Sequence, residues 1–315
     1  MSKRRGKIDV TSAKPALSGD LTIVKTIQVF NQKNKLKNLS EHTIKYYSEN
    51  LNSVRKVLES FGVVMADEVT REVINNYIEG QINKGTSTVT INTKLRAIRA
   101  LFNFLFKDGY ISQNPVDGLE LLKNTRNEIQ TFSKQQINKL IKALDTTWFT
   151  GFRDYVIIML MLETGVRVRE LCDIRMRDVY LEDKFISVIG KNTERRNLPF
   201  QNKMKNILSQ YIEIRGEIPG VSHLFITEDN TPITTRGVQE CFKRLSKRVD
   251  IPDVRISPHT FRHTFAKMWI QNGGDTFSLQ KILGHKSMDM VRIYVNMFDG
   301  DVQKAHEKFS PVERL

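Results

Sequence analysis

Apolar residues recur at helical spacing along the first third of the chain. One such face runs through Leu21, Val24, Ile27 and Phe30. Because residues three or four apart share one face of a helix, this pattern predicts a helix that begins near Leu21. Three more periodic segments follow, each opening at a capping side chain and closing at a glycine. Their expected bounds are Ser40 to Gly62, Thr70 to Gly85, and Ser87 or Thr90 to Gly109. Helices joined by such short loops are typical of a small bundle.

A change of pattern after these helices divides the chain into two domains. Asn114-Pro115 marks the end of the bundle, since the residue before a proline is biased away from helix. The stretch that follows is polar and reads as a linker. We expect a flexible basic leader at 1–20, a helical domain at 21–118, a linker at 119–131 and a second domain at 132–315.

The second domain is predicted to be mainly helical, with a small β-hairpin. Ser133 is positioned to cap its first helix, and the apolar run from Tyr155 to Leu162 fits a helix buried in the core. The segments Phe185–Ile189 and Asn197–Phe200 are predicted strands joined by a basic turn. The whole pattern favours a mainly α fold with a small sheet, of the α+β class.

The net charge of +14 favours a polyanionic partner. Residues 1–125 carry 19 Lys and Arg against 12 Asp and Glu, and residues 126–315 carry 30 against 23, so each part has a charge of +7. Both domains could therefore face phosphates, as a clamp around a DNA duplex requires. The alternative is charge that serves solubility alone.

Composition excludes several classes of protein. Hydrophobic residues make up 40% of the chain and charged residues 27%, as in soluble globular proteins. No apolar run approaches the roughly 20 residues that span a bilayer, and no apolar stretch follows the basic N-terminus as in a secretory signal. Cys172 and Cys241 give neither a disulfide framework nor metal-ligand spacing. We expect no membrane contact and a location in the reducing cytoplasm.

Six polar residues of the second domain suit chemistry at a phosphodiester. They are Arg167, Lys191, His259, Arg262, His285 and Tyr294. Two guanidiniums, an ammonium, two imidazoles and a phenol make a poor metal site and a poor acyl-transfer site. Arginine grips non-bridging phosphate oxygens in a two-pronged fork, and a phenol can attack phosphorus. The set predicts an enzyme that breaks and rejoins DNA through a tyrosine.

The local sequence places the first of these side chains. Gly165 allows a sharp turn after an apolar helix, so that Arg167 leaves a buried element and points into a cleft. Glu170 lies three residues further on and could brace this guanidinium. Lys191 lies where a strand enters the hairpin turn, which could carry its ammonium into a groove.

A helix start accounts for two more. Ser257-Pro258 provides a serine cap and a proline in the first helical position. His259 and Arg262 then share a face near the positive end of the helix dipole, which is a favourable place for phosphate.

Each candidate also has a purely structural explanation. Arg167 could be solvated or paired with a carboxylate, and His259 could cap its own helix. His285 could be a packing histidine, and Tyr294 lies in an apolar stretch typical of a core. His263 is expected to face away from His259 and to be structural.

Four short motifs and the tyrosine occur in a fixed order. Thr-Gly-x-Arg-x-x-Glu-Leu lies at 164–171, Gly-Lys at 190–191 is followed by Leu-Pro at 198–199, Pro-His-x-x-Arg-His lies at 258–263, and Leu-Gly-His at 283–285 precedes the tyrosine by nine residues. In this order they resemble the tyrosine recombinases of the phage-integrase and Xer class. The segments 40–47 and 114–115 extend the resemblance to the first domain. It implies an N-terminal four-helix, SAM-like core-binding domain and a C-terminal catalytic domain of the simple two-domain type.

The resemblance implies a role for each residue that holds phosphate. Arg167 and Arg262 would grip the scissile phosphate and stabilise its pentavalent transition state. His285 would hold another phosphate oxygen, and Glu170 resembles the family's supporting acid.

It also implies roles in bond cleavage. Tyr294 would form a 3′-phosphotyrosyl link, Lys191 would protonate the departing 5′-oxygen, and His259 would assist proton movement at the tyrosine. The covalent link conserves the phosphodiester energy, so no ATP, metal or other cofactor is expected. The lack of carboxylate clusters in the sequence argues against a two-metal transposase or nuclease.

Partners follow from the same resemblance. We expect binding to double-stranded DNA with paired half-sites, a homotetramer on two duplexes, and possible accessory DNA-bending proteins. The short leader leaves no room for a domain that binds distant arm sites. The segment Asp301–Phe309 is expected to form a helix that docks on a neighbouring protomer or folds back in cis. Candidate DNA contacts are Lys94, Arg96, Arg99, Arg195, Arg196, Arg236, Lys243 and Arg244.

Two alternatives share this scaffold. One is a DNA-binding regulator that has lost catalysis, although such a protein has no need of Tyr294. The other is an enzyme similar to type IB topoisomerases, which shares the chemistry but relaxes DNA without site preference.

Overall fold

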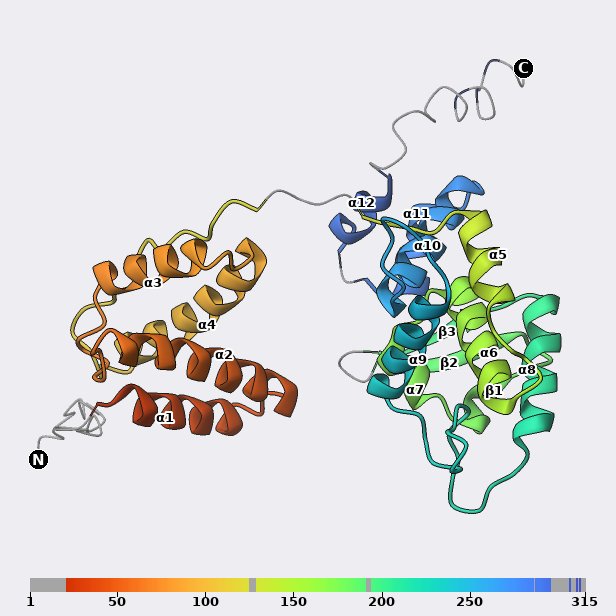
Figure 1. Cartoon of the computed structure of the whole chain (residues 1–315), viewed down its shortest axis with the longest axis horizontal. Helices are drawn as coiled ribbons and strands as arrows, with labels where there is room; N and C mark the ends of the chain where they lie inside the picture. Colours follow the sequence, from red (N-terminus) through yellow and green to blue (C-terminus); the bar gives the residue numbers. More distant parts are fainter. Residues whose placement is uncertain are drawn as a thin grey trace, which may run out of the picture. The chain divides into compact units, whose positions relative to one another are not determined.

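The chain divides into two compact units, Met1–Asn127 and Glu128–Leu315. The computed structural model describes residues 21–124, 129–190, 194–285 and 287–295, together with residues 306, 310 and 312. Each unit has its own hydrophobic core. Figure 1 shows the helices of each unit and the small sheet of the second.

Helices make up the regular structure of the first unit within its described residues. They are α1 (Ile23–Leu36), α2 (Glu41–Ser60), α3 (Arg71–Asn83) and α4 (Thr88–Lys107). Ser40, Thr70 and Ser87 each accept a hydrogen bond from the backbone N–H three residues on, which is the expected capping geometry. The cap of α4 is therefore Ser87 and not Thr90, whose hydroxyl instead bonds that of Ser87.

The buried face of α1 differs from the predicted one. Ile23, Ile27 and Phe30 are buried, whereas Val24 is 42% exposed. The spacing of Val24 from Ile27 fits a helix face, but the face of α1 that is buried is rotated toward Ile23. The prediction for Val24 is therefore wrong.

The first unit continues past its expected end. Leu119 is buried against the bundle, and Leu122 packs on the same core. The side chain of Asn92 on α4 donates to the carbonyl of Leu122 and accepts from its N–H, both at 2.9 Å. This clasp ties the start of the expected linker to the bundle.

The second unit is mainly helical, with a small sheet. Its helices are α5 (Lys134–Lys142), α6 (Phe149–Thr164), α7 (Val168–Asp173), α8 (Asn202–Arg215), α9 (Thr235–Arg248), α10 (Pro258–Gln271), α11 (Thr276–Leu283) and α12 (Asp289–Val295), with a 3₁₀ turn, η1, at Met176–Asp178. Its strands are β1 (Val179–Tyr180), β2 (Phe185–Ile189) and β3 (Arg195–Pro199), antiparallel in the order β1-β2-β3. The predicted fold class is confirmed.

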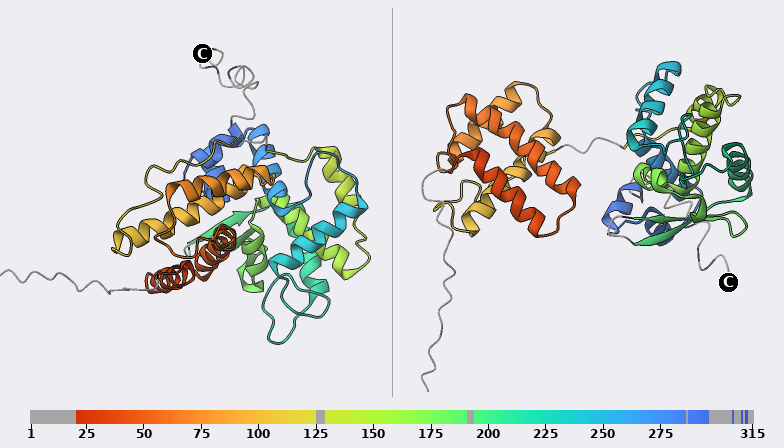
Figure 2. Two further views of the ribbon diagram at one scale, coloured as in Figure 1. Left: turned by 60° about the vertical axis from the view of Figure 1, so that its left-hand side comes forward. Right: turned by 90° about the horizontal axis from the view of Figure 1, so that it is seen from below.

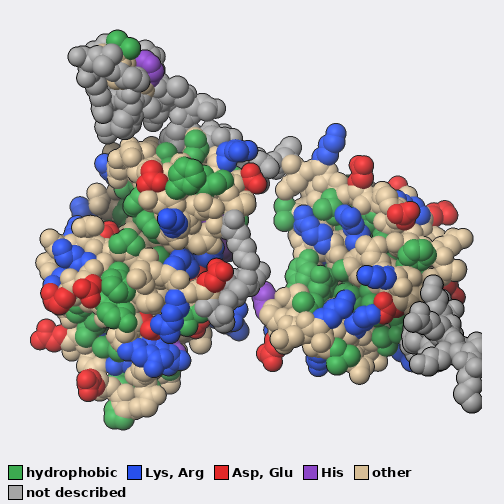
Figure 3. All heavy atoms as spheres, turned by 180° about the vertical axis from the view of Figure 1, so that it is seen from behind, with side chains coloured by type: hydrophobic (Ala, Val, Ile, Leu, Met, Phe, Trp, Pro, Cys, Tyr) green, Lys and Arg blue, Asp and Glu red, His purple; other side chains and the backbone are tan. Residues whose placement is uncertain are grey.

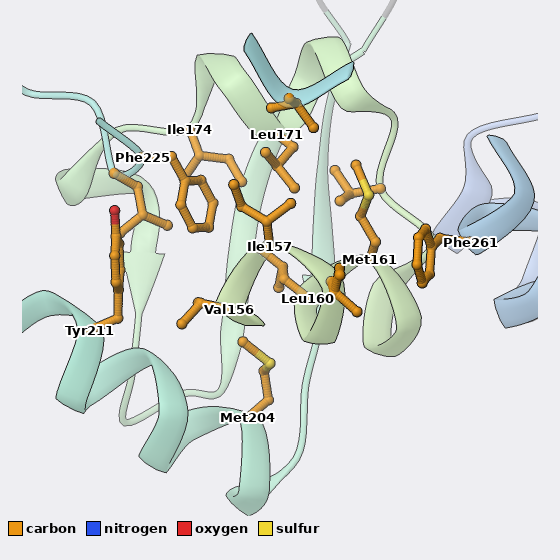
Figure 4. Close-up of a cluster of buried hydrophobic side chains, with 14 of the residues drawn as sticks. Val156, Ile157, Leu160, Met161, Leu171, Ile174, Met204, Tyr211, Phe225 and Phe261 are labelled. Atoms are coloured by element: carbon orange, nitrogen blue, oxygen red, sulfur yellow. The ribbon is translucent and has the colours of Figure 1, made fainter. Parts of the chain in front are cut away.

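One helix forms the centre of the second core. Val156, Ile158, Leu160 and Met161 on α6 have no measurable exposure, so this helix is buried almost all round. Figure 4 shows α6 side chains facing Leu171 and others from neighbouring elements. α6 packs against α8 and α10, and β2 alternates buried and less buried residues beside the helical body (Figure 2).

A smaller hydrophobic cluster joins α10, α11 and α12. Its buried members are Phe265, Ala266, Leu279, Leu283, Val291 and Tyr294. Tyr294 thus packs within its own unit. No described helix is long and apolar enough to cross a membrane.

Candidate active site

Gly165 makes the turn on which the site is built. It ends α6 in the left-handed region, with φ of +62°. A Cβ atom at this position would lie 2.4 Å from Cδ1 of Phe265 and 2.8 Å from Cδ2 of Leu283. A glycine is therefore required both by the backbone and by the close approach of α10 and α11.

Arg167 follows this turn and occupies the N-cap position of α7. Its Nη1 donates to Oε1 of Glu170 at 2.9 Å, and its Nη2 donates to the carbonyl of Gly284 at 3.0 Å. The Arg167 N–H also donates to Oε2 of Glu170. The side chain is 36% exposed, so it is held firmly and still open to a ligand.

Arg196 on β3 binds the same carboxylate from the other side. Its Nη1 donates to Oε1 of Glu170 at 2.9 Å and its Nη2 donates to Oε2 at 2.6 Å. Its Nε donates to the carbonyl of Ile282 at 2.9 Å. With 14% of its side chain exposed, Arg196 is enclosed by protein, which differs from the DNA contact expected from the sequence.

Arg262 on α10 is buried more deeply. Its Nη1 donates to the carbonyl of Gly165 at 2.6 Å, and its Nη2 donates to the carbonyl of Leu283 at 2.7 Å. Burial, together with the charge of Arg167, lowers the pKa of Arg262 to about 9. The guanidinium therefore remains charged near neutral pH.

These arginines meet at the C-terminal end of α11. The successive carbonyls of Ile282, Leu283 and Gly284 accept from Arg196, Arg262 and Arg167 respectively. The last carbonyls of a helix lack partners within the helix and carry partial negative charge, so cations are favoured there. We call Arg167, Arg196, Arg262 and Glu170 the arginine cluster.

Glu170 is the carboxylate within the arginine cluster. It is 6% exposed. Burial alone would raise the pKa of its carboxyl, but the hydrogen bonds and charges of Arg196 and Arg167 lower it below the ordinary value. Its negative charge faces two of the three arginines, so the cluster keeps an excess of positive charge.

His285 follows directly after the helix end. Its Nε2 lies 2.9 Å from Nη2 of Arg262. Because a guanidinium only donates, Nε2 accepts and the ring proton lies on Nδ1. Burial and the neighbouring positive charges lower the pKa of His285 to about 4, so the imidazole is neutral near pH 7. Its Nδ1 is buried and has no hydrogen-bond partner among the described residues.

Tyr294 lies on α12 and is 3% exposed. Its hydroxyl lies 2.8 Å from Nδ1 of His263. Burial raises the pKa of the Tyr294 phenol, and the charges of Arg262 and Arg167 oppose that rise. Burial, with His259 and Arg262 nearby, lowers the pKa of His263 below its ordinary value. A neutral imidazole therefore faces a neutral phenol.

His263 is the site residue that the sequence reasoning missed. It was expected to face away from His259 and to be structural. The spacing carried a signal, since residues four apart lie on the same face of a helix. His259 itself lies in the first turn of α10 with an exposed side chain.

Two further predictions fall partly or wholly outside the described residues. Lys191 lies there, although the strands on either side of its turn, β2 and β3, are paired as predicted. The helix expected at Asp301–Phe309 also lies there, apart from His306. In the described part of the chain, no group of three or more His, Cys, Asp or Glu residues could hold a metal ion.

The other DNA-contact candidates lie at the surface. On α4, Arg96 is exposed and Lys94 and Arg99 are half-buried; on α9, Arg236, Lys243 and Arg244 are exposed; on β3, Arg195 is exposed. Taken separately, each unit carries Lys and Arg side chains on the face seen in Figure 3, with acidic side chains among them.

Comparison with known proteins supports a functional assignment of this geometry. Residues 130–300 match the phage integrase family, and residues 33–109 match the N-terminal SAM-like domain of phage integrases. The tyrosine recombinase XerC of Thermodesulfovibrio yellowstonii is 30% identical over 87% of this chain and 92% of its own.

Solved structures agree in fold. The Tn1549 transposon integrase in complex with a circular intermediate DNA has a TM-score of 0.71 at 21% identity, covering 87% of this chain and 95% of that one. A lambda integrase tetramer bound to a Holliday junction has a TM-score of 0.73 at 18% identity, covering 90% and 83%.

Proposed function

The chain belongs to the phage integrase family and is a tyrosine site-specific recombinase, and on that premise we propose that Tyr294 forms a covalent 3′-phosphotyrosyl link with DNA. The observation that carries this proposal is the gathering of Arg167 and Arg262 at the end of α11, in the unit whose α12 holds Tyr294. Widely separated segments of chain meet there around an excess of positive charge.

In this proposal Arg167 and Arg262 hold the scissile phosphate, and His285 joins them through its Nδ1–H, which has no partner among the described residues. In this proposal the two guanidiniums stabilise the charge that develops on the non-bridging oxygens as phosphorus becomes five-coordinate. Donors fixed in advance are usually the largest contribution to catalysis, because they need no reorganisation during the reaction. The hydrogen bonds from Arg167 and Arg262 to helix-end carbonyls hold these groups in advance.

Strand cleavage is balanced by two proton movements. The phenolic oxygen of Tyr294 bonds to phosphorus, and its proton passes to a histidine, either His259 or the adjacent His263. The bond to the 5′-oxygen breaks, and Lys191 supplies the proton that this oxygen needs. Rejoining reverses both proton transfers, so cleavage followed by rejoining requires no ATP.

The proposed assembly is a tetramer on two duplexes. The lambda integrase relative forms a tetramer on a Holliday junction, and the positive charge of both parts of this chain suits a clamp on DNA. In this proposal each protomer binds one half-site, the segment 301–309 contacts a neighbour, and DNA-bending proteins assist. The reaction serves integration, excision or resolution of a mobile element, plasmid or chromosome in the cytoplasm.

A nicked suicide substrate tests the chemistry. With its cognate site in such a substrate, the wild-type protein is expected to form an adduct that survives SDS. Tyr294→Phe is expected to bind the same DNA with unchanged affinity and to form no adduct, since it lacks only the attacking oxygen. Normal recombination by Tyr294→Phe would overturn the assignment of the nucleophile.

The same assay separates the alternatives. Specific binding by the wild type without any adduct would support an inactive regulator. Adducts of equal yield at unrelated sequences would support an enzyme of the topoisomerase type.

A further inference from the structure

Arg196 is a largely enclosed arginine that the proposed chemistry does not use. Its fork takes both oxygens of Glu170, and its Nε holds the carbonyl of Ile282. The three bonds join β3, α7 and α11. A bidentate guanidinium–carboxylate pair is among the stronger and most directional hydrogen-bonded contacts in proteins.

We infer that Arg196 is a positioning residue that neutralises Glu170, so that Arg167 keeps its positive charge and its orientation for the scissile phosphate. The inference rests on the proposed function of Arg167 as a phosphate ligand.

The charge balance supports this role. Glu170 contacts both Arg167 and Arg196, and its carboxylate is almost fully buried. With Arg196 present, one positive charge in this group of three is left in excess. Without it, Arg167 and Glu170 would form a one-to-one pair with no net charge, and an anion would gain much less from Arg167.

The contact to α11 supports it further. Arg196 binds the carbonyl of Ile282, two residues before the carbonyl of Gly284 that holds Arg167. A Cβ atom on Gly284 would lie 3.2 Å from the guanidinium of Arg196. The helix end, the turn at Gly284 and Arg196 are therefore fitted to one another.

A change of substrate charge tests the inference. The variant Arg196→Met removes the charge and keeps an unbranched side chain. On a suicide substrate with an ordinary phosphate we expect the cleavage rate to fall roughly ten- to a hundredfold, while specific DNA binding is retained. A methylphosphonate at the scissile position lacks one negative oxygen and depends less on Arg167. On that substrate the defect is expected to shrink at least several-fold.

The control is a buried arginine at a distance from the site. Arg153 pairs with Asp154 at 2.7 Å and is 5% exposed. Any defect of Arg153→Met is expected to be equal on the two substrates. An equal defect of Arg196→Met on both substrates would mean that Arg196 only supports the fold, and the inference would be lost.

Two further variants keep the test decisive if Arg196→Met folds poorly. Arg196→Lys restores a cation beside Glu170 without the two-pronged contact, so it is expected to recover part of the cleavage rate that Arg196→Met loses. In the Glu170→Gln background no carboxylate needs neutralising, so adding Arg196→Met is expected to cause little further loss. A full additional loss in that double variant would contradict the charge argument. Wild-type adduct formation, measured alongside, tests the proposed function separately.

Discussion

Two groups of buried arginines in the second unit use their charge differently. Arg153 on α6 pairs with the adjacent Asp154 and donates to the carbonyl of Ile226. One cation meets one carboxylate. In the arginine cluster, Arg167 and Arg196 share Glu170, while Arg262 binds the carbonyl of Leu283 at the end of α11. The charge of Arg153 is balanced by a carboxylate of the protein, whereas the arginine cluster keeps an excess of positive charge.

The difference supports the proposed roles, in which Arg153 serves stability and the arginine cluster binds a phosphate. A balanced buried pair gains little from an added anion. An unbalanced cluster raises the free energy of the ligand-free protein through mutual repulsion, and an arriving phosphate relieves that repulsion. Burial alone would not have separated Arg153 from Arg262, because the two are 4% and 6% exposed.

Arg262→Ala is expected to have the largest effect, which is a loss of catalytic rate. Arg262 has a neighbour of like charge in Arg167, which contributes to its lowered pKa. Its loss should slow adduct formation by a hundred- to a thousandfold or more. Because the repulsion is also removed, the free energy of unfolding should fall less than in Arg153→Ala. The rate on the suicide substrate and a urea titration check the two parts.

The second effect is on stability, through Arg153→Ala. This change leaves Asp154, whose side chain is 14% exposed, without its cation. Breaking a buried pair in this way typically costs about 3–5 kcal/mol. We expect a lower midpoint of urea unfolding, with an adduct rate close to wild type at temperatures where the variant is folded. A rate defect as large as that of Arg262→Ala would erase the distinction between the two groups.

The smallest effect concerns protons at His285. The pKa of His285 in the folded protein is about 4, below its ordinary value of 6.5. Between these values the unfolded chain binds a proton that the folded protein does not. The contribution of neutral His285 to the free energy of unfolding is therefore complete above about pH 6.5, and it is lost as the pH falls toward 4.

His285→Gln keeps an acceptor for Arg262 but does not titrate. Its free energy of unfolding should therefore depend on pH less steeply than that of the wild type, by up to about one proton. Urea titrations between pH 7 and pH 4 measure the two slopes. Parallel slopes would show that His285 titrates normally.

Local signals in the sequence predicted much of this molecule. Each helix cap accepts a hydrogen bond from a backbone N–H three residues away, so a short stretch of sequence is enough to predict it. The caps predicted in this way are Ser40, Thr70, Ser133 and Ser257. β2 was predicted with its observed bounds, whereas β3 runs from Arg195 to Pro199 and not from Asn197 to Phe200 as predicted. β1 was not predicted, because two residues carry no readable alternation.

Contacts between distant segments could not be predicted from short stretches of sequence. Arg196 meets Glu170 across 26 positions and Ile282 across 86, and no period or cap links them. Its expected place among the DNA contacts followed from its charge and its neighbour Arg195. His263 meets Tyr294 across 31 positions. Motif order indicated the candidate site, but only folding decides which of its basic side chains turn inward.

The enclosure of Tyr294 has a consequence for the protein at rest. Reagents that nitrate or iodinate phenols act on side chains they can touch, and Tyr180 is 41% exposed whereas Tyr294 is 3% exposed. Oxidants that reach the DNA-free enzyme will therefore damage surface phenols first. The proposed nucleophile is therefore sheltered from such reagents in the DNA-free protein.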